Sequence, residues 1–280
     1  MPLLTPTEVA RLLRTHGLAP RRSAGQNLVV DPNTVRRIVA AAHLDADDEV
    51  LEIGPGLGSL TLGLAAVARR VTAIEVDAGF VAALAEVLAG LDHVEVVHAD
   101  ALAVDLAALI GDREVRAVAN LPYNLATPLL FKLLATPQVV DGYLMVQREV
   151  GERWQARVGD PLYAGVSLKL ALLAEVTVDL AIPRGVFHPV PNVDSVMVRV
   201  TRRADAPTGP VYARLAALVD AAFSQRRKTL RNTLRRVADP ETLGAAAAVA
   251  GLDLAARAET LDAAMLRRLD QALTGGAGRP

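Results

Sequence analysis

The sequence predicts an α/β protein, with a mostly parallel, doubly wound sheet of seven strands followed by a small helical domain. Two observations predict this fold. Short β-rich runs alternate with helical patterns from residue 49 onward, which is typical of a parallel sheet with helices on both faces. Beyond about residue 208, leucine and alanine recur at helical spacing without strand-like runs. We therefore predict one domain over residues 1–204 and a second over residues 205–280.

The composition is that of an enzyme-sized globular protein. With 280 residues, 52% of them hydrophobic, the chain can bury a full core. The formal net charge of −1 gives no overall nucleic-acid signature, so a basic surface has to come from local clustering. The absence of cysteine excludes disulfides and thiolate chemistry. Since no signal segment or long apolar run occurs, we expect a cytoplasmic protein without a membrane partner, and we expect it to act as a monomer.

The first part of the chain is expected to be helical. Residues before about Ser23 predict a short amphipathic helix and a basic loop with Arg21 and Arg22, and a second helix is expected to follow Asp31-Pro32. Short runs of small and β-branched residues then predict five buried strands. These strands cover residues 50–53, 71–76, 94–99, 115–119 and 143–146.

Two more strand-like runs complete the predicted sheet. They cover residues 176–182 and 196–200 and are separated by a proline-rich segment at 183–191. Because no helix lies between them, we expect them to pair antiparallel at the edge of the sheet. Residues 201–210 are typical of a linker, and helices are predicted beyond it.

A glycine-rich turn at residues 54–58 follows the first strand of the alternating region and precedes a helix. Glycine there lets the backbone pass close to a nucleotide or nucleoside ligand. The spacing Gly-x-Gly-x-Gly, with Glu52 just before it, favours S-adenosylmethionine over NAD, which remains the alternative cofactor. Glu75 ends the next strand about 20 residues later, where an acid can accept hydrogen bonds from ribose hydroxyls. Asp100 ends the third strand, within reach of an adenine amine.

The motif Asn120-Leu121-Pro122-Tyr123 lies where another buried strand ends. Asn120 Oδ1 and the Leu121 carbonyl can each accept a hydrogen bond from the exocyclic amine of an adenine. Pro122 restricts Leu121 to extended geometry and so aims its carbonyl, while Tyr123 can stack on the base. Positioning beside a methyl donor would supply most of the rate, without a strong general base. The alternative is that the motif has no function in binding, because an ordinary turn after a strand would account for any three of these four residues.

A basic segment at residues 223–236 lies in the predicted helical domain. The cations that we select as RNA-binding candidates are Arg226, Arg227, Lys228, Arg231 and Arg235. On a helix they would cover more than one face. A solvated helix is the usual alternative, but so many cations with few acids favour an RNA phosphate footprint. No pair of the five histidines has convincing ligand spacing with carboxylates, so we predict no catalytic metal.

Four motifs in order make the chain resemble the ribosomal RNA adenine N6,N6-dimethyltransferases over nearly its whole length. They are Gly25-Gln26-Asn27, the segment 52–58, the segment 120–124 and Phe187-x-Pro-x-Pro-x-Val-Asp-Ser at 187–195. The chain is most similar to the kasugamycin-resistance type. That branch dimethylates two adjacent adenosines in a loop near the 3′ end of 16S rRNA, during late small-subunit biogenesis.

The resemblance implies a Rossmann-like, seven-stranded S-adenosylmethionine-dependent methyltransferase fold, with 16S rRNA in the assembling small subunit as the partner. By position in the motifs, it implies that S-adenosylmethionine contacts Asn27, Val29, Gly54, Glu75, Asp100 and Asn120. The target adenine would be held by Asn120, Leu121 and Tyr123. Phe187 would supply a second stacking face, although an aromatic plug in a proline-rich loop is an equal alternative from the residues alone.

The chain departs from the family pattern at four positions, namely Leu28, Val29, Ala126 and Asn192, where phenylalanine, leucine, serine and lysine are usual.

Three other functions remain open. The 23S rRNA methylases of the erythromycin-resistance type share the central motifs but lack much of the flanking context. A nucleic-acid-binding factor in ribosome assembly or transcription could use the same fold, and a nicotinamide-dependent dehydrogenase would need hydride chemistry that the motif at 120–123 does not suggest.

Overall fold

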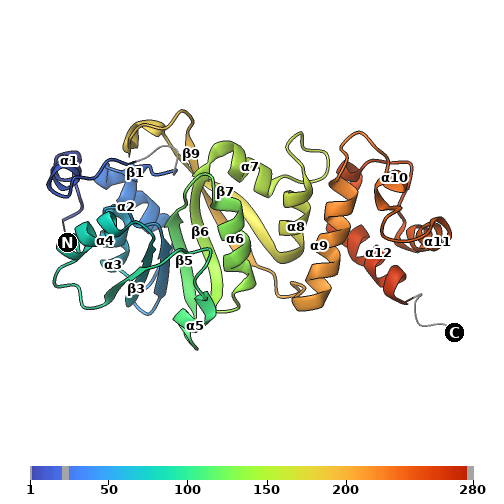
Figure 1. Cartoon of the computed structure of the whole chain (residues 1–280), viewed down its shortest axis with the longest axis horizontal. Coiled ribbons are helices and arrows are strands. Elements are labelled where there is room, and N and C mark those ends of the chain that lie inside the picture. Colours follow the sequence, from blue (N-terminus) through green and yellow to red (C-terminus); the bar gives the residue numbers. More distant parts are fainter. Residues whose placement is uncertain (1, 21–24, 276–280) are drawn as a thin grey trace. The chain divides into compact units, whose positions relative to one another are not determined.

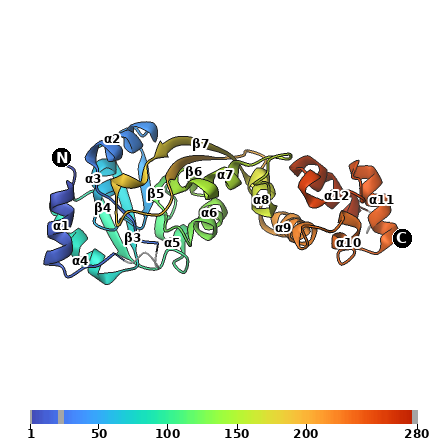
Figure 2. The ribbon, with the colours of Figure 1, turned by 90° about the horizontal axis from the view of Figure 1, so that it is seen from above.

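A computed structural model describes residues 2–20 and 25–275 and divides the chain into two units (Figures 1 and 2). The first unit contains Met1–Gly151 and Thr177–Thr201, and the second contains Glu152–Val176 and Arg202–Pro280. The basic loop predicted around Arg21 and Arg22 lies outside the described residues. No helix in the described ranges is both long and apolar enough to cross a membrane.

The first unit is built on the seven-stranded sheet, with the strand order β4-β3-β2-β5-β6-β9-β7. Its strands are β2 (Glu49–Ile53), β3 (Arg70–Glu75), β4 (Val94–His98), β5 (Val115–Asn120), β6 (Val139–Gln147), β7 (Ala174–Ile182) and β9 (Ser195–Arg202). Strands β2 to β6 pair in parallel, whereas β9 is antiparallel to β6 and β7 forms the edge beside it. The predicted Rossmann-like sheet is therefore confirmed.

The predicted strands agree closely with those of the structure, and the largest difference concerns β6. This strand begins at Val139, four residues before the predicted start at 143. Asp141 and Gly142 interrupt its apolar run, so the pattern alone hides the first part of the strand. In the structure Asp141 accepts hydrogen bonds from Arg116 of the neighbouring β5, at 3.0 and 3.1 Å, which stabilises a charged residue at this position.

Helices pack around the strands of the first unit, and several of them begin at side-chain caps. They are α1 (Pro6–Thr15), α2 (Pro32–Ala41), α3 (Ser59–Ala65), α4 (Ala78–Val87), α5 (Leu106–Ile110), α6 (Ala126–Ala135) and α7 (Arg148–Gln155), the last of which crosses the unit boundary. Thr5 and Glu8 form a capping box at α1, Asp31 caps α2 and Asp77 caps α4. The cap at Asp77 fixes where α4 begins after the end of β3.

A two-stranded ribbon lies outside the main sheet and was not predicted. It pairs β1 (Leu28–Val29) antiparallel with β8 (Phe187–His188). A short 3₁₀ turn, η2 (Arg184–Val186), precedes β8, and Val30 N donates a hydrogen bond to the Val186 carbonyl at 2.9 Å. Strands of two residues have no periodicity to detect, so only the tertiary pairing reveals them.

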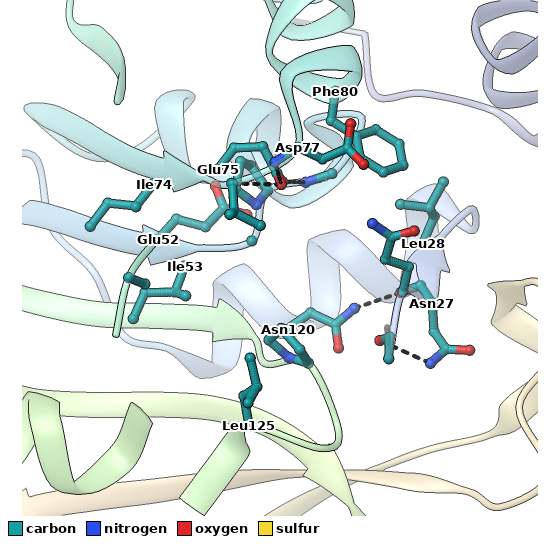
Figure 3. A pocket seen from close by; sticks show the side chains of 18 of the residues that line it. Asn27, Leu28, Glu52, Ile53, Ile74, Glu75, Asp77, Phe80, Asn120 and Leu125 are labelled. Atoms are coloured by element: carbon teal, nitrogen blue, oxygen red, sulfur yellow. Dashed lines mark hydrogen bonds between the residues drawn. The ribbon is translucent and has the colours of Figure 1, made fainter. Parts of the chain in front are cut away.

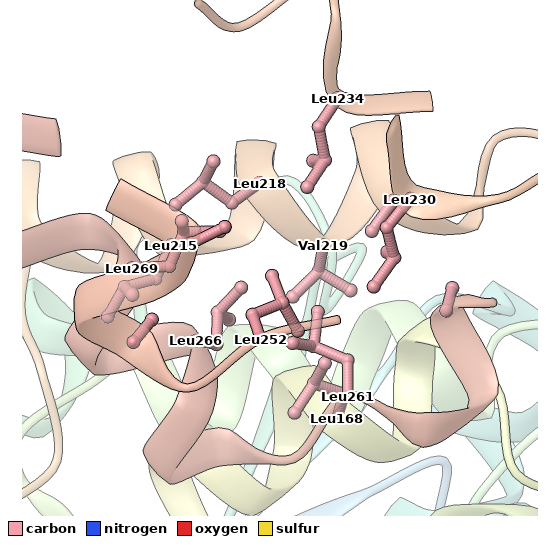
Figure 4. Packing of buried hydrophobic residues seen from close by; sticks show 14 of the residues in the cluster. Leu168, Leu215, Leu218, Val219, Leu230, Leu234, Leu252, Leu261, Leu266 and Leu269 are labelled. Atoms are coloured by element: carbon pink, nitrogen blue, oxygen red, sulfur yellow. The ribbon is translucent and has the colours of Figure 1, made fainter. Parts of the chain in front are cut away.

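The second unit is helical and has its own hydrophobic core (Figure 4). Its helices are α8 (Gly165–Leu173), α9 (Gly209–Phe223), α10 (Leu230–Leu234), α11 (Pro240–Ala250) and α12 (Ala263–Gly275), with η3 (Ala258–Thr260) before the last. Leu168 of α8 packs in the same cluster as Leu215 of α9 and Leu266 of α12. This packing explains why residues 152–176 group with the second unit, although we predicted a single boundary after residue 204.

The basic segment at 223–236 is not one continuous helix, which corrects the sequence-based interpretation. Helix α9 ends at Phe223, and the chain turns before α10 begins at Leu230. The amides of Leu230 and Arg231 donate to the carbonyls of Ala256 and Leu254, at 2.8 and 2.9 Å. These tertiary hydrogen bonds hold the turn, and no local pattern in the segment predicts them.

Candidate active site

A pocket of about 560 Å³ lies at the carboxyl ends of β2, β3, β4 and β5 in the first unit (Figure 3). Its lining comes from the glycine turn after β2, the ends of the neighbouring strands and the loop at residues 25–29. Ligands of open α/β sheets bind at such strand ends. The pocket is therefore the candidate site for a cofactor.

The glycine turn shapes one wall of the pocket. Gly54, Gly56 and Gly58 have φ values of 70°, 56° and 84°, which side chains rarely adopt. A Cβ atom on Gly56 would lie 2.5 Å from Leu28 Cδ2, so the turn and the loop at 25–29 touch. Gly54 N donates to the Ile74 carbonyl at 2.9 Å, which anchors the start of the turn to β3.

Glu75 is fixed at the end of β3 by three backbone amides. Its Oε2 accepts from Gly56 N at 3.2 Å, and its Oε1 accepts from Val76 N and Asp77 N, each at 2.9 Å. Burial raises the pKa of Glu75, and these hydrogen bonds oppose that shift. Because a carboxylate has about four acceptor sites, Glu75 can still accept a hydrogen bond from a ribose hydroxyl.

Asp100 lies just after β4, lines the pocket and is exposed. Its Oδ1 accepts from Leu102 N at 2.8 Å. Lys132 of α6 supports the same loop, since its Nζ donates to the carbonyls of Leu102 and Val104 at 2.7 and 2.5 Å. The loop thus holds the Asp100 carboxylate at the pocket wall.

Asn120 ends β5 with its amide held in one orientation (Figure 3). Its Nδ2 donates to the Asn27 carbonyl at 2.7 Å. Since that partner is an acceptor, the amide nitrogen must face it, and Oδ1 faces the other way. Oδ1 is buried and has no hydrogen-bond partner among the described residues. A buried acceptor of this kind is suited to a donor on a ligand.

Leu121 and Tyr123 continue the motif beyond the strand. Leu121 N donates to the Met145 carbonyl at 3.1 Å, and no described residue donates a hydrogen bond to the Leu121 carbonyl. Tyr123 Oη lies 2.7 Å from Ser195 Oγ, and burial raises the pKa of this phenol. Ser195 is fully buried and fixes the outer end of the Tyr123 ring.

Phe187 lies in β8, opposite Val29, and is only 2% exposed. It packs in a core cluster with Tyr143 and Met197 and is not among the described residues that line the pocket. Its ring faces core residues in this structure. The stacking role that we expected for Phe187 therefore stays a prediction and would require the ring to become accessible.

The structure brings most of the selected residues to one place. All six residues expected at the cofactor line the pocket, namely Asn27, Val29, Gly54, Glu75, Asp100 and Asn120. Leu121 and Tyr123 follow directly in the chain. The five basic candidates belong to the second unit, where all are exposed; they are Arg226, Arg227, Lys228, Arg231 and Arg235.

The sequence analysis did not single out Asp77 and Ser59, and it noted Glu52 and Ser195 only within their motifs, without placing them among the site residues. Asp77 and Ser59 line the pocket, and Ser195 holds Tyr123. Glu52 also lines it at 1% exposure, and burial raises the pKa of Glu52 to about 8. Position in the chain was the available signal, because Glu52 lies two residues before Gly54 of the glycine turn and Ser195 belongs to the motif at 187–195.

Comparison with known proteins decides the family. A sequence model of the family described as ribosomal RNA adenine dimethylase matches residues 17–272. The chain belongs to the ribosomal RNA adenine dimethylase family. This dimethylase is 46% identical over 276 residues to a protein of Thermobifida fusca (strain YX) named ribosomal RNA small subunit methyltransferase A, with 95% of each chain covered.

Two solved structures resemble this dimethylase over most of its length. A dimethyladenosine transferase from Plasmodium falciparum has a TM-score of 0.75 at 26% identity, covering 89% of this chain and 98% of the other. The 23S rRNA methyltransferase ErmE has a TM-score of 0.69 at 29% identity, covering 89% and 100%. The dimethylase is therefore an S-adenosylmethionine-dependent rRNA adenine methyltransferase.

The pocket of this dimethylase fits its cofactor. The glycine turn allows close approach of a ligand, Glu75 retains acceptor capacity for a ribose, and the unpartnered Asn120 Oδ1 lies at the pocket lining. S-adenosylmethionine would thus lie across the strand ends, as in other ligand sites of this sheet class.

Proposed function

We propose that this dimethylase transfers methyl groups from S-adenosylmethionine to N6 of two adjacent adenosines in a loop near the 3′ end of 16S rRNA. The products would be N6,N6-dimethyladenosines, formed in the cytoplasm during late assembly of the small ribosomal subunit. We also propose that the protein acts as a monomer.

Similarity to named relatives supports the choice of RNA. Eight curated relatives, 43–46% identical, carry the name ribosomal RNA small subunit methyltransferase A. The 23S rRNA methyltransferase ErmE is 29% identical to this chain. The small-subunit relatives are thus nearer in sequence over a comparable span.

The observation that carries the proposed chemistry is the buried, unpartnered Oδ1 of Asn120. The sulfonium of S-adenosylmethionine supplies an electrophilic methyl group when the cofactor is bound. An adenine amine is a poor nucleophile, because its lone pair is delocalised into the ring. Asn120 Oδ1 and the Leu121 carbonyl would each accept one of its two N–H groups, which favours a localised lone pair aimed at the methyl group.

The remaining groups position the base. Tyr123, held by Ser195, would stack on the adenine. The methylated nitrogen is acidic and can lose its proton to water, so no strong base is needed. N6-methyladenine has a single N–H, and the second transfer would therefore use only one of the two acceptors.

Basic residues of the second unit would supply the RNA contact. Arg226, Arg227 and Lys228 lie in the turn after α9, and Arg231 and Arg235 lie on and just beyond α10. All five side chains are exposed, and none forms an ion pair with a described residue. Free cations of this density suit RNA phosphates.

Mass spectrometry tests the proposed function. Undermethylated small subunits and free rRNA are incubated with the protein and labelled S-adenosylmethionine, and the RNA is then digested. We expect dimethyladenosine at two adjacent positions near the 3′ end of 16S rRNA. Label in 23S rRNA instead would favour an activity like that of ErmE. Cofactor binding without any RNA label would favour a binding factor.

The variant Asn120→Ala tests the assigned acceptor in the same assay. We expect a loss of at least about a hundredfold in methylation rate, the scale reported for removing one oriented group that stabilises a transition state. Full methylation by this variant would contradict the role of Asn120. A thermal melt of the variant controls for unfolding.

A further inference from the structure

Helix α1 packs behind the cofactor pocket without lining it. A capping box at Thr5 and Glu8 fixes where the helix begins, and Val9, Leu12 and Leu13 form its buried face. No residue of α1 is among the described residues that line the pocket. The cofactor site described above therefore leaves this helix without a function.

The buried face of α1 packs with residues that do line the pocket. It shares a hydrophobic cluster with Leu28 of the loop at 25–29, Leu57 of the glycine turn and Phe80 of α4. All three residues line the pocket, where Figure 3 labels Leu28 and Phe80. They thus pack with α1 on one side and border the pocket on the other. Because protein interiors are closely packed, loss of α1 from this cluster would let the pocket wall shift.

One acid of α4 binds α1 through two side chains. Glu86 Oε1 accepts a hydrogen bond from Arg11 Nη2, and Glu86 Oε2 accepts one from His16 Nε2, both at 2.9 Å. The hydrogen bond from His16, followed by that from Arg11, lowers the pKa of Glu86, so this group is a carboxylate at neutral pH. Glu86 is the one charged residue of α4, which spans Ala78–Val87.

A second contact joins the segment after α1 to the start of α4. Leu18 is partly buried in the same cluster. A Cβ atom on Gly79, the second residue of α4, would lie 2.5 Å from Leu18 Cδ2, so the two segments touch there. The neighbouring residues Ala78 and Phe80 line the pocket. The helix that holds α1 at Glu86 therefore contributes its first turn to the pocket wall.

We propose that α1 supports the wall of the cofactor pocket, and that Glu86, Arg11 and His16 are positioning residues that hold α1 in place. None of the three contacts the cofactor. They act on it through the three apolar residues that α1 packs against. The proposal concerns cofactor binding and does not depend on which RNA is methylated.

The ion pair is exposed, with 52% of the Arg11 side chain and 43% of the Glu86 side chain accessible. Such a pair contributes little to the free energy of global unfolding. A single helix can, however, open locally at a much lower free energy than the whole protein. A small change in this contact therefore shifts the fraction of molecules with α1 in place. Because only those molecules have the complete pocket wall, cofactor binding and the packing of α1 favour each other.

Hydrogen exchange of the full chain, measured by mass spectrometry with and without S-adenosylmethionine, tests the proposal without any variant. We expect the cofactor to slow the exchange of the α1 amides, although α1 does not line the pocket. Helix α12 packs in the core of the second unit and should exchange at the same rate in both states. If the cofactor protected the loop at 25–29 but left α1 unchanged, the proposal would be overturned.

The variant Glu86→Gln removes the charge and keeps the size of the side chain. We expect it to raise the Kd for S-adenosylmethionine about fivefold, the upper end for one exposed ion pair, and to speed the exchange of α1. Its methylation rate at saturating cofactor should equal that of the wild type, because no group at the reacting atoms is changed. A wild-type Kd for this variant, with or without a lower melting temperature, would overturn the proposal.

Exchanging the two charges gives a readout that general destabilisation would not give. Arg11→Glu and Glu86→Arg should each weaken cofactor binding, whereas the double variant should recover part of the affinity because the ion pair is restored with reversed charges. Additive losses in the double variant would show that the pair has no such role.

The matched control is Glu95→Gln. Glu95 of β4 is 51% exposed, lies 3.6 Å from Arg70 and is not among the described residues that line the pocket. Its Kd for S-adenosylmethionine should equal that of the wild type. An equal rise in Kd for Glu86→Gln and Glu95→Gln would overturn the proposal, because loss of any negative charge would then explain both. These experiments measure cofactor binding, so their failure is separable from failure of the RNA assay.

Discussion

The amide of Asn120 serves two purposes at once. Its Nδ2 is bound to the Asn27 carbonyl at 2.7 Å, and its Oδ1 remains buried and unpartnered. The sequence predicted that the Asn120 oxygen is available to a ligand, since an amide at the end of a buried strand can hold an amine. It could not predict the first, because Asn27 lies 93 residues away and the hydrogen bond depends on how the loop at 25–29 folds back.

Ser195 illustrates a residue that acts through another. Its hydroxyl lies 2.7 Å from Tyr123 Oη and is fully buried. We expect Ser195→Ala to lower the methylation rate about fivefold, roughly the value of one hydrogen bond between neutral groups. The Kd for S-adenosylmethionine should stay unchanged, because Ser195 does not line the pocket.

Single-turnover kinetics and calorimetry on the same preparation check this prediction. Ser195→Thr, which retains a hydroxyl, should recover part of the rate if its added methyl group is accommodated. A parallel loss of cofactor affinity would indicate a general structural role instead.

Gly56 offers a test of the glycine turn. A Cβ atom there would lie 2.5 Å from Leu28 Cδ2, at a φ of 56°. Gly90 has a φ of 81° but nothing within 4 Å of the same position. We expect Gly56→Ala to weaken cofactor binding and to lower stability beyond the ~1–2 kcal/mol that a positive φ alone costs. Gly90→Ala should lower stability only by the amount that the positive φ costs, and its Kd for S-adenosylmethionine should be unchanged.

Thermal melts of the two variants compare their stability, and titrations with S-adenosylmethionine compare their affinity for the cofactor. Equal effects of Gly56→Ala and Gly90→Ala on cofactor affinity would show that close packing of the turn is unimportant.

At the scale of elements, the regular strands of the sheet were predictable and the irregular connections were not. Apolar runs predicted the central strands to within a few residues, because burial on both faces demands apolar residues throughout. The edge strands β4 and β7 are partly exposed, and their β-branched residues still marked them as strands. The β1–β8 ribbon and the turn before α10 depend on pairing between distant segments. Phe187 belongs to this ribbon, and its burial agrees with the aromatic plug that was one of the two alternatives from the sequence.

The link between α6 and the loop after β4 gives a prediction at this scale. Lys132 donates to the carbonyls of Leu102 and Val104, and Asp100 begins the same loop. We expect Lys132→Met to weaken cofactor binding severalfold, because hydrogen bonds from a charged donor contribute about 1.5–3 kcal/mol. Fluorescence or calorimetric titration with S-adenosylmethionine measures the change.

The control for this variant is Lys169→Met. Lys169 pairs at 2.7 Å with Asp220, which is 70% exposed, and both residues lie in the second unit. Surface pairs contribute little, so cofactor affinity should not change. The role assigned to Lys132 would be wrong if both variants bound the cofactor like the wild type.

At the scale of the whole molecule, the sequence predicted two parts with one boundary after residue 204, whereas the structure groups residues 152–176 with the second unit. Residues 152–176 continue the alternating pattern of the first unit, yet Leu168 and Leu172 are buried in the core of the second. Hydrophobic spacing shows which face of a helix is buried but not which core receives it. The division therefore becomes visible only when the packing partners are known.

Glu52 also gives a prediction for the stability of the whole molecule. Its pKa is raised by burial from 4.5 to about 8, so between these values the folded protein holds a proton that the unfolded chain releases. The stability contributed by this group is full below pH 4.5 and is lost as the pH rises toward 8. We expect the melting temperature of the cofactor-free wild type to fall relative to Glu52→Gln across this range.

Differential scanning calorimetry of both proteins over that range measures the effect. Glu75, whose pKa is also raised by burial, is present in both proteins, but its charge interacts with the Glu52 carboxyl only in the wild type. Parallel curves for the two proteins would show that Glu52 does not titrate as described.

The hydrogen bond between Asn120 and Asn27 has a consequence for the order of events in catalysis. Only when the loop at 25–29 lies in place is the amide turned with its oxygen free. With that loop displaced, the amide can rotate and present N–H donors, which oppose the N–H donors of an adenine amine. The residue proposed to receive the methyl acceptor would thus be correctly oriented only when the cofactor pocket is assembled, and an enzyme with that loop displaced would hold its RNA base poorly.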